Sequence, residues 1–298
     1  MSHTNHSEEK ENFKKLDSEY KLLLSKIANT IRGLSMDAVQ KADSGHPGMP
    51  MGFAEIGAYL WANQMRYNPK NAKWANRDRL ILSAGHGSMW LYSGLFLSGY
   101  GLKMEDIQNF RQLHSLTPGH PEAEMTVGVE TTTGPLGQGF GNAVGQALGL
   151  KILAAKFNTK NHEIFNSKVY CVVGDGCMME GVTSEVSSLA GHLKLNNLIV
   201  LYDANEVTLD GPLAESNSEN TKMRYEAYGW EVYTIDGNNL DEVHEVLTKA
   251  KENQQKPRLI IAHTIIGKGS PNKAGTFKVH GSPLGQEELI ASKKALGI

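Results

Sequence analysis

The stretch Val169-Tyr170-Cys171-Val172-Val173-Gly174-Asp175-Gly176 passes from five hydrophobic residues directly into an aspartate between two glycines. A second hydrophobic run, Leu198-Ile199-Val200-Leu201-Tyr202, passes in the same way into Asp203-Ala204-Asn205. Short, uninterrupted runs of this kind are typical of strands in a parallel sheet, because both faces of such a strand are buried. We therefore expect two buried strands that end side by side, one at a carboxylate and the other at a carboxamide.

Strand and helix patterns alternate on both sides of this stretch. Such alternation predicts an α/β fold, with a parallel sheet and helices on both of its faces. Further strands are expected at residues 79–83, 230–235 and 258–264. Helices are expected at residues 18–41, 89–97, 138–157, 180–193 and 240–253. Residues 212–221 and 267–283 are expected to be long loops, which usually carry function or are disordered.

The composition limits the class of protein. The chain has 298 residues, of which 40% are hydrophobic and 21% charged, as in globular proteins with one large domain or two small ones. A formal charge of -2, with acids and bases intermixed, argues against a nucleic-acid partner. No apolar run is long enough to span a membrane, and the polar start, Met1 to Lys15, has no signal-peptide core. Cys171 and Cys177 are expected to be free thiols, which indicates a cytoplasmic protein.

The two strand ends could form a site for a divalent cation and a diphosphate. Ligands of open parallel sheets bind at the carboxyl ends of the strands, and Mg²⁺ prefers carboxylate, amide and phosphate oxygens. Asp175, the amide oxygen of Asn205 and the backbone carbonyl of Val207 could supply three ligands. Gly174 and Gly176 would let the backbone approach a phosphate closely. The alternative is a Gly-Asp-Gly turn without a ligand, which is common; the asparagine at the end of the second strand favours the ligand site.

Four histidines lie beside glycine in the sequence: His46, His86, His120 and His280. Glycine removes bulk next to the imidazole, which near neutral pH can donate to phosphate, accept a hydroxyl proton or stabilise an alkoxide. Their spacing does not fit a zinc site. The other histidines lack this setting and are expected to have no role in a site; they are His3, His6, His114, His162, His192, His244 and His263.

The pairing of Gly174-Asp175-Gly176 with Asn205 resembles the fingerprint of thiamine diphosphate enzymes, and further segments resemble the transketolase family in particular. These segments are Ser44-Gly45-His46-Pro47-Gly48, Ser83-Ala84-Gly85-His86-Gly87, Thr117-Pro118-Gly119-His120-Pro121-Glu122, Thr133-Gly134-Pro135-Leu136-Gly137-Gln138-Gly139 and Gly269-Ser270-Pro271-Asn272-Lys273-Ala274-Gly275. The resemblance covers the chain from about Ile27 to Leu296. It implies a polar extension at residues 1–20, followed by a single thiamine diphosphate-binding domain of the PP type at residues 21–298.

The resemblance also implies roles for single residues. Asp175, Asn205 and the Val207 carbonyl would ligate Mg²⁺, with Ca²⁺ or Mn²⁺ as alternatives. The residues implied to surround thiamine diphosphate are His86, Gly134, Leu136, Gly174, Asp175, Gly176, Glu180, Asn205 and His280; within this set, Glu180 would join an interface network between two cofactor sites. The implied catalytic residues are His46, His120 and His280, which would move protons at the ketose hydroxyls. The reaction would transfer a two-carbon ketol unit from a ketose phosphate to an aldose phosphate.

One feature departs from the family. Transketolases are much longer, and their pyrimidine-binding and C-terminal domains have no counterpart in this sequence. The resemblance therefore implies half of an active site, inactive alone and completed by a transketolase chain that carries the pyrimidine domain. A natural subunit of a split enzyme and a fragment of a longer chain both fit. Self-association is also expected, because such a domain would expose apolar surface.

Two other functions stay open. The first is a related thiamine-dependent ketol transferase that acts on another sugar phosphate. The second is a binding or regulatory homologue without turnover, which would be expected to have lost Asp175, Asn205 or the histidines beside glycine. All of these residues are present. No nucleic acid or membrane is expected as a partner.

Overall fold

The fold is described from a computed structural model, which covers residues 15–252 and 254–298. Most of the polar extension expected at residues 1–20 therefore lies outside the described residues. The first helix, α1, spans Ser18–Ala42, and the side chain of Asp17 caps it by accepting from the backbone N–H groups of Glu19 and Tyr20. Within the described residues, no helix has the length and apolar character needed to cross a membrane.

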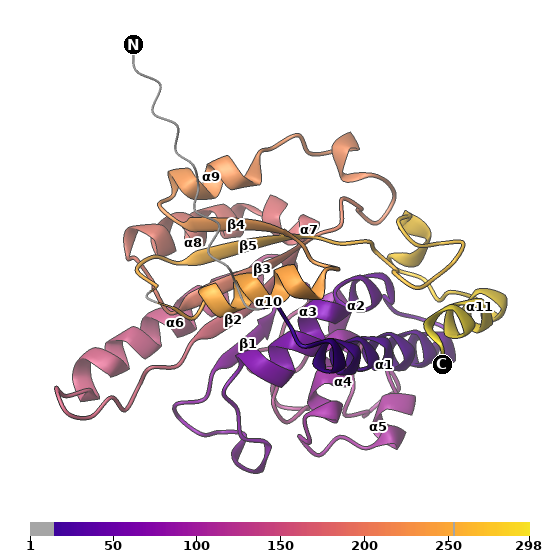
Figure 1. Cartoon of the computed structure of the whole chain (residues 1–298), viewed down its shortest axis with the longest axis horizontal. Helices are drawn as coiled ribbons and strands as arrows, with labels where there is room; N and C mark the ends of the chain where they lie inside the picture. The colour runs from indigo at the N-terminus through magenta and orange to yellow at the C-terminus, as the bar shows by residue number, and fades with distance from the viewer. Residues whose placement is uncertain (1–14, 253) are drawn as a thin grey trace.

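The centre of the molecule is a sheet of five parallel strands in the order β1-β2-β3-β5-β4 (Figure 1). The strands are β1 (Arg79–Leu82), β2 (Val169–Gly174), β3 (Leu198–Ala204), β4 (Glu231–Asp236) and β5 (Arg258–His263). Strands β2 and β3 are neighbours, and their register pairs Gly174 with Asp203. Every residue of these two strands is buried, which explains their nearly unbroken hydrophobic sequence. The expected side-by-side strand ends are confirmed.

Helices cover both sides of the sheet, so the expected α/β architecture is confirmed. In the view of Figure 1, α9 lies above β4 and β5, whereas α1, α3 and α4 lie below these two strands. After α1, the helices are α2 (Gly48–Gly52), α3 (Ala54–Tyr59), α4 (Ser88–Leu97), α5 (Met104–Gln108), α6 (Gln138–Phe157), α7 (Asp175–Met179), α8 (Gly181–His192), α9 (Thr221–Ala227), α10 (Leu240–Lys249) and α11 (Gln286–Leu296).

The structure also contains helices that the sequence patterns do not predict: α2, α3, α5, α9 and α11. The other differences are small shifts at the ends of elements. The helix expected at residues 180–193 is α8, and the short helix α7 precedes it, separated by the extended backbone of Glu180. Helix α10 ends at Lys249, earlier than expected. The two expected loops contain short 3₁₀ turns, Leu213–Glu215 and Phe277–Val279.

A second, smaller core holds the long segment that follows β5. Its buried side chains are those of Met36, Met51, Ile266, Val279, Leu284 and Leu289. The buried carboxylate of Glu288 on α11 accepts hydrogen bonds from the Ser270 hydroxyl and from the backbone N–H of Asn272. These contacts attach the segment to α1 and α11. They therefore fix the backbone that carries His280, one residue after buried Val279.

Candidate functional site

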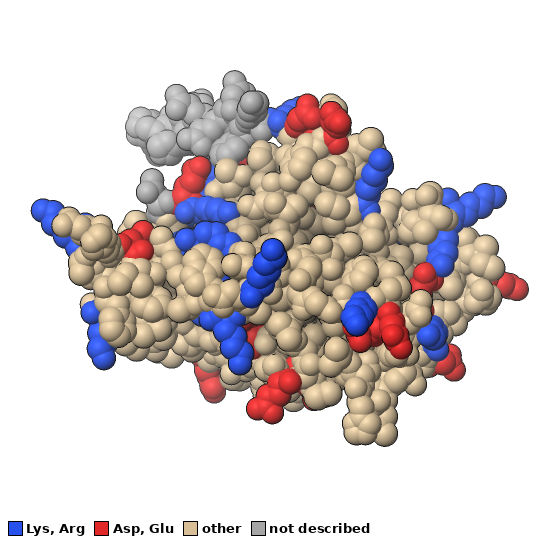
Figure 2. All heavy atoms as spheres, turned by 90° about the horizontal axis from the view of Figure 1, so that it is seen from below, with Lys and Arg blue, Asp and Glu red and all other residues tan. Residues whose placement is uncertain are grey.

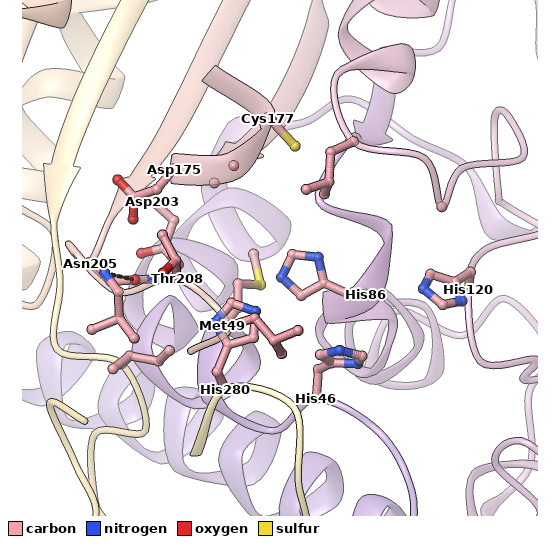
Figure 3. Close-up of a pocket in the computed structure, with 17 residues that line it drawn as sticks. His46, Met49, His86, His120, Asp175, Cys177, Asp203, Asn205, Thr208 and His280 are labelled. Atoms are coloured by element: carbon pink, nitrogen blue, oxygen red, sulfur yellow. Dashed lines mark hydrogen bonds between the residues drawn. The ribbon is translucent and has the colours of Figure 1, made fainter. Parts of the chain in front are cut away.

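A cavity of about 300 Å³ lies at the carboxyl ends of β2 and β3 (Figure 3). Its lining residues are His46, Met49, His86, His120, Gly134, Leu136, Gly174, Asp175, Gly176, Cys177, Asp203, Asn205, Val207, Thr208, Leu209, Ile266 and His280. The structure thus brings together all of the site residues expected from the sequence except Glu180. Glu180 is exposed and precedes α8, outside this cavity. Its implied place in an interface network between two sites stays a prediction.

Asp175 begins α7 directly after β2, and its buried carboxylate faces two hydrogen-bond donors. The Tyr202 hydroxyl donates to Oδ1 over 2.6 Å, and the backbone N–H of Glu206 donates to Oδ2 over 3.1 Å. Burial raises the pKa of Asp175 to about 6, although both hydrogen bonds act in the opposite direction. A carboxylate kept in such a place is costly unless a positive charge compensates it, which a divalent cation would do.

Asn205 is oriented by a second buried carboxylate. Its Nδ2 donates to Oδ2 of Asp203 over 2.9 Å, and its Oδ1 accepts from the backbone N–H of Val207 over 3.1 Å. Asp203 also accepts from the Thr264 hydroxyl, and burial together with the charge of Asp175 raises the pKa of Asp203 to about 7. Sequence reasoning assigned no role to Asp203. The only sequence feature that indicated a role for Asp203 is its position at the end of β3, two residues before Asn205.

The residues at the strand ends fit a hard divalent cation. The described residues contain no cluster of three or more His, Cys, Asp or Glu side chains arranged to hold a metal. A cation here would therefore depend on Asp175, on the amide oxygen of Asn205, on backbone oxygen and on oxygens of its ligand. This oxygen set is the type that Mg²⁺ uses when it binds together with phosphates.

The four histidines beside glycine form a cluster, although they come from four separate segments (Figure 3). His46 is central: its ring centroid lies 5.1 Å from that of His86 and 5.9 Å from that of His280. The ring of His120 lies 6.4 Å from His46, and the rings of His86 and His280 stack at 5.3 Å. The remaining histidines within the described residues do not line this cavity; His3 and His6 lie outside the described residues.

All four imidazoles favour the neutral form. Burial, with smaller contributions from the neighbouring histidines and, for His46, from Arg111, lowers the pKa of His46 to about 4 and that of His86 to about 3. Burial also lowers the pKa of His120 and of His280. Among the described residues, Nδ1 of His46 and Nδ1 of His280 are buried without a hydrogen-bond partner. Buried polar atoms are normally paired, so these two nitrogens are suited to contact a ligand.

Gly176 leaves space that a larger residue would remove. A Cβ atom at this position would lie 2.8 Å from Cδ1 of Leu136, another lining residue. A side chain at position 176 would therefore crowd the cavity, and glycine leaves the backbone at the start of α7 uncovered. The lining also includes five residues that no motif indicated: Met49, Cys177, Thr208, Leu209 and Ile266. Cys177 and Cys171 are both free and buried, which confirms the expected thiols.

Comparison with known proteins gives consistent matches. Residues 24–298 match the family described as "Transketolase, thiamine diphosphate binding domain". The chain is 55% identical over 272 residues to transketolase 1 of Escherichia coli, covering 91% of this chain and 41% of that protein. It is also 55% identical over 267 residues to a transketolase of Geobacillus stearothermophilus, covering 89% of this chain and 40% of that protein.

Solved structures agree with the sequence matches. A transketolase from Leishmania mexicana has a TM-score of 0.90 and 46% identity, covering 92% of this chain and 41% of that one. A transketolase from Pichia stipitis in complex with sedoheptulose 7-phosphate has a TM-score of 0.90 and 45% identity, covering 93% of this chain and 41% of that one. The chain thus spans about two fifths of the length of these relatives. On these matches, the chain belongs to the transketolase family and corresponds to its thiamine diphosphate-binding domain.

Proposed function

We propose that this chain is the cofactor-binding part of a transketolase, which transfers a two-carbon ketol unit from a ketose phosphate to an aldose phosphate. The observation that supports this most is the single cavity in which Asp175 and Asn205 lie near four neutral imidazoles. An oxygen-rich end suits a cation with a diphosphate, and an imidazole-lined end suits a polyhydroxylated substrate.

Each end of the cavity has its own task in this proposal. Asp175, Asn205 and the Val207 carbonyl hold Mg²⁺, or Ca²⁺ or Mn²⁺ in its place, while Gly176 and His86 contact the diphosphate. Thiamine diphosphate, when bound, supplies the electron sink for cleavage and formation of the carbon–carbon bond. The protein contributes binding, orientation and exclusion of water.

The imidazoles of His46, His120 and His280 would move protons at the hydroxyl groups of the sugar. A neutral imidazole near pH 7 is able to accept a hydroxyl proton and to return it later. The low pKa of His46 keeps this ring in the accepting form throughout the physiological range. Proton transfer by a positioned side chain typically contributes a factor of about 10²–10⁴ to a rate.

A pyrimidine-binding part would complete the site. The chain covers only 41% of its E. coli relative, so we assign the remaining groups to such a part, carried by a partner chain or by the rest of a longer one. Figure 2 shows a face on which Lys, Arg, Asp and Glu side chains are sparse. Several large apolar side chains are exposed, among them Leu113, Leu116, Met125 and Val127. Such surface favours association with a partner or with a second copy, and the buried free thiols agree with a cytoplasmic setting.

Complementation tests this function. The purified chain is mixed with a polypeptide that corresponds to the part of E. coli transketolase 1 beyond the matched region, in the presence of thiamine diphosphate, Mg²⁺ and both sugar phosphates. We expect ketol transfer from the mixture and none from either polypeptide alone, because each supplies part of the site. Full activity of the lone chain would contradict the half-site. An associated but inactive mixture would contradict the transketolase activity.

Substitution of His120 by Ala is expected to separate substrate handling from cofactor binding. His120 lines the cavity on the side away from Asp175 (Figure 3). In the assembled protein we expect kcat to fall by about 10²–10⁴-fold while the affinity for thiamine diphosphate changes little. Steady-state kinetics and calorimetric titration give the two quantities. His162→Ala, at an exposed position outside the cavity, is the matched control and should change neither.

A further inference from the structure

Arg111 lies between the two segments that carry His46 and His120. A Cβ atom at Gly119 would lie 2.7 Å from Nε of Arg111 and 3.1 Å from its Cζ. A Cβ atom at Gly45 would lie 3.5 Å from Nη1 of the same side chain. The guanidinium therefore lies against the backbone of the residue that precedes each of the two histidines. Gly119 makes room for it, whereas at Gly45 the closest atoms to a Cβ would belong to Phe110 and Val39, at 3.0 Å.

The backbone of Arg111 is itself unusual. Its φ of 61° is in the left-handed region, which a non-glycine residue adopts only at a cost. Its N–H donates to the carbonyl of Thr117 over 3.0 Å, which closes the loop that leads to Gly119. The side chain extends over the ring of Phe110, with 6.0 Å between Cζ and the ring centroid. The loop thus directs a guanidinium toward the histidines despite the conformational cost.

Among residues 15–252 and 254–298, the guanidinium forms no ion pair and no side-chain hydrogen bond. Its charge acts on the two neighbouring imidazoles instead. For His120, burial is the largest cause of the lowered pKa and Arg111 is the other. For His46, burial comes first, followed by His280, Arg111 and His120. The pKa of His280 responds to burial and, in the opposite direction, to Asp210.

We propose that Arg111 is a positioning residue, whose guanidinium sets the spacing between the segments of His46 and His120. The planar guanidinium fits between two backbones that carry no side chain, which the tetrahedral ammonium of lysine would not reproduce. Its positive charge also disfavours a second positive charge on either ring, so both stay available as proton acceptors. The assignment of the two imidazole rings to the substrate rests on the proposed function. The contacts of Arg111 with Gly45 and Gly119 do not depend on that function.

Titration of the histidines by NMR tests the effect of the charge. The chain is labelled with ¹⁵N-histidine, and the imidazole pKa values are measured for the wild type, Arg111→Gln and Arg111→Lys. We expect Arg111→Gln to raise the pKa of His46 and of His120 and to leave that of His280 unchanged. Arg111→Lys should keep both values close to the wild type because it keeps the charge. Unchanged pKa values of His46 and His120 in Arg111→Gln would overturn the proposal that the charge of Arg111 acts on these two rings.

A double-mutant cycle tests the positioning. Gly119→Ala should lower the Tm in the wild-type background, because the new methyl group meets the guanidinium at 2.7 Å. The same substitution should lower the Tm much less in Arg111→Ala, where the guanidinium is gone. Equal shifts in the two backgrounds would overturn the proposed contact. Gly119 does not have a positive φ, so alanine adds no backbone strain of its own.

The two proposals fail in different ways. If the histidine pKa values and the Tm cycle behave as expected but the complemented protein transfers no ketol unit, the role of Arg111 stands and the proposed function is wrong. If ketol transfer is present but Arg111→Gln moves neither pKa value and the cycle is additive, only the role of Arg111 is wrong. Both sets of measurements use the same chain.

Discussion

Substitution of Asp175 by Asn is expected to abolish the Mg²⁺-dependent binding of thiamine diphosphate in the complemented protein. Asp175 is the only charged side chain in the proposed metal-ligand set, and asparagine retains its shape but not its charge. The loss of affinity should exceed about 100-fold, because even side chains that only orient a metal ligand contribute about 10–100-fold. Calorimetric titration with and without Mg²⁺ measures the effect. Wild-type affinity in Asp175→Asn would contradict the metal role.

The same substitution should make the chain more stable when no metal is bound. Burial raises the pKa of Asp175 from its ordinary value to about 6, so ionisation of this carboxyl opposes folding. The cost is fully present above about pH 6, and it disappears as the pH falls toward about 4. At pH 7–8 in EDTA, Asp175→Asn should therefore be more stable than the wild type by about 1–3 kcal/mol. Asparagine is able to keep both contacts, by accepting from the Glu206 N–H and donating to the Tyr202 hydroxyl.

Asp236→Asn is the matched control. Asp236 lies at the end of β4, a position similar to that of Asp175 after β2. Its side chain is exposed and accepts from the backbone N–H of Asn238. This variant should bind the metal and cofactor as the wild type does, and its unfolding free energy should change little with pH relative to the wild type. Urea unfolding at pH 4 and pH 8 measures the stability difference. If both variants gain stability equally at pH 8, the gain comes from net charge and not from the buried site.

The parts of the fold that could be predicted from the sequence are those determined by local pattern. Strands β2 and β3 were located because every residue in them is buried, so the hydrophobic runs have no interruption. Helices α2 and α3 could not be predicted, for a related reason. All of their residues are buried, so their sequences carry no amphipathic period, and Pro50 and three glycines further obscure them.

The site shows the same division between local and long-range information. Asp175 and Asn205 could be predicted because adjacent parallel strands bring their own carboxyl ends together. The role of Asp203 could not, because its burial and its bond to the Thr264 hydroxyl depend on the pairing of β3 with β5. Met49 and Ile266 reach the cavity through contacts between distant segments, which leave no pattern along the chain.

Substitution of Gly191 by Ala is expected to produce a large loss of stability. Gly191 lies in α8, and a Cβ atom there would lie 1.9 Å from the backbone oxygen of Tyr228. That oxygen belongs to the connection between α9 and β4. The connection is fixed because Nε1 of Trp230 donates to the carbonyl of Ser187 over 2.9 Å, while the Ser187 hydroxyl bonds to Tyr225 over 2.9 Å. Because backbone must move away from backbone, we expect destabilisation of about 3 kcal/mol or more.

Gly145→Ala is the matched control for this prediction, since it makes the same change in α6 with the opposite expected sign. Gly145 is exposed, and a Cβ atom there would meet nothing within 4 Å. Alanine should therefore stabilise the chain by about 0.5–1 kcal/mol, through its greater helix propensity and a smaller entropy loss on folding. Urea unfolding of both variants measures the pair. If both substitutions destabilise the chain to a similar extent, the effect comes from replacing any glycine within a helix. If Gly191→Ala lowers and Gly145→Ala raises the unfolding free energy, the effect comes from the contact between α8 and Tyr228.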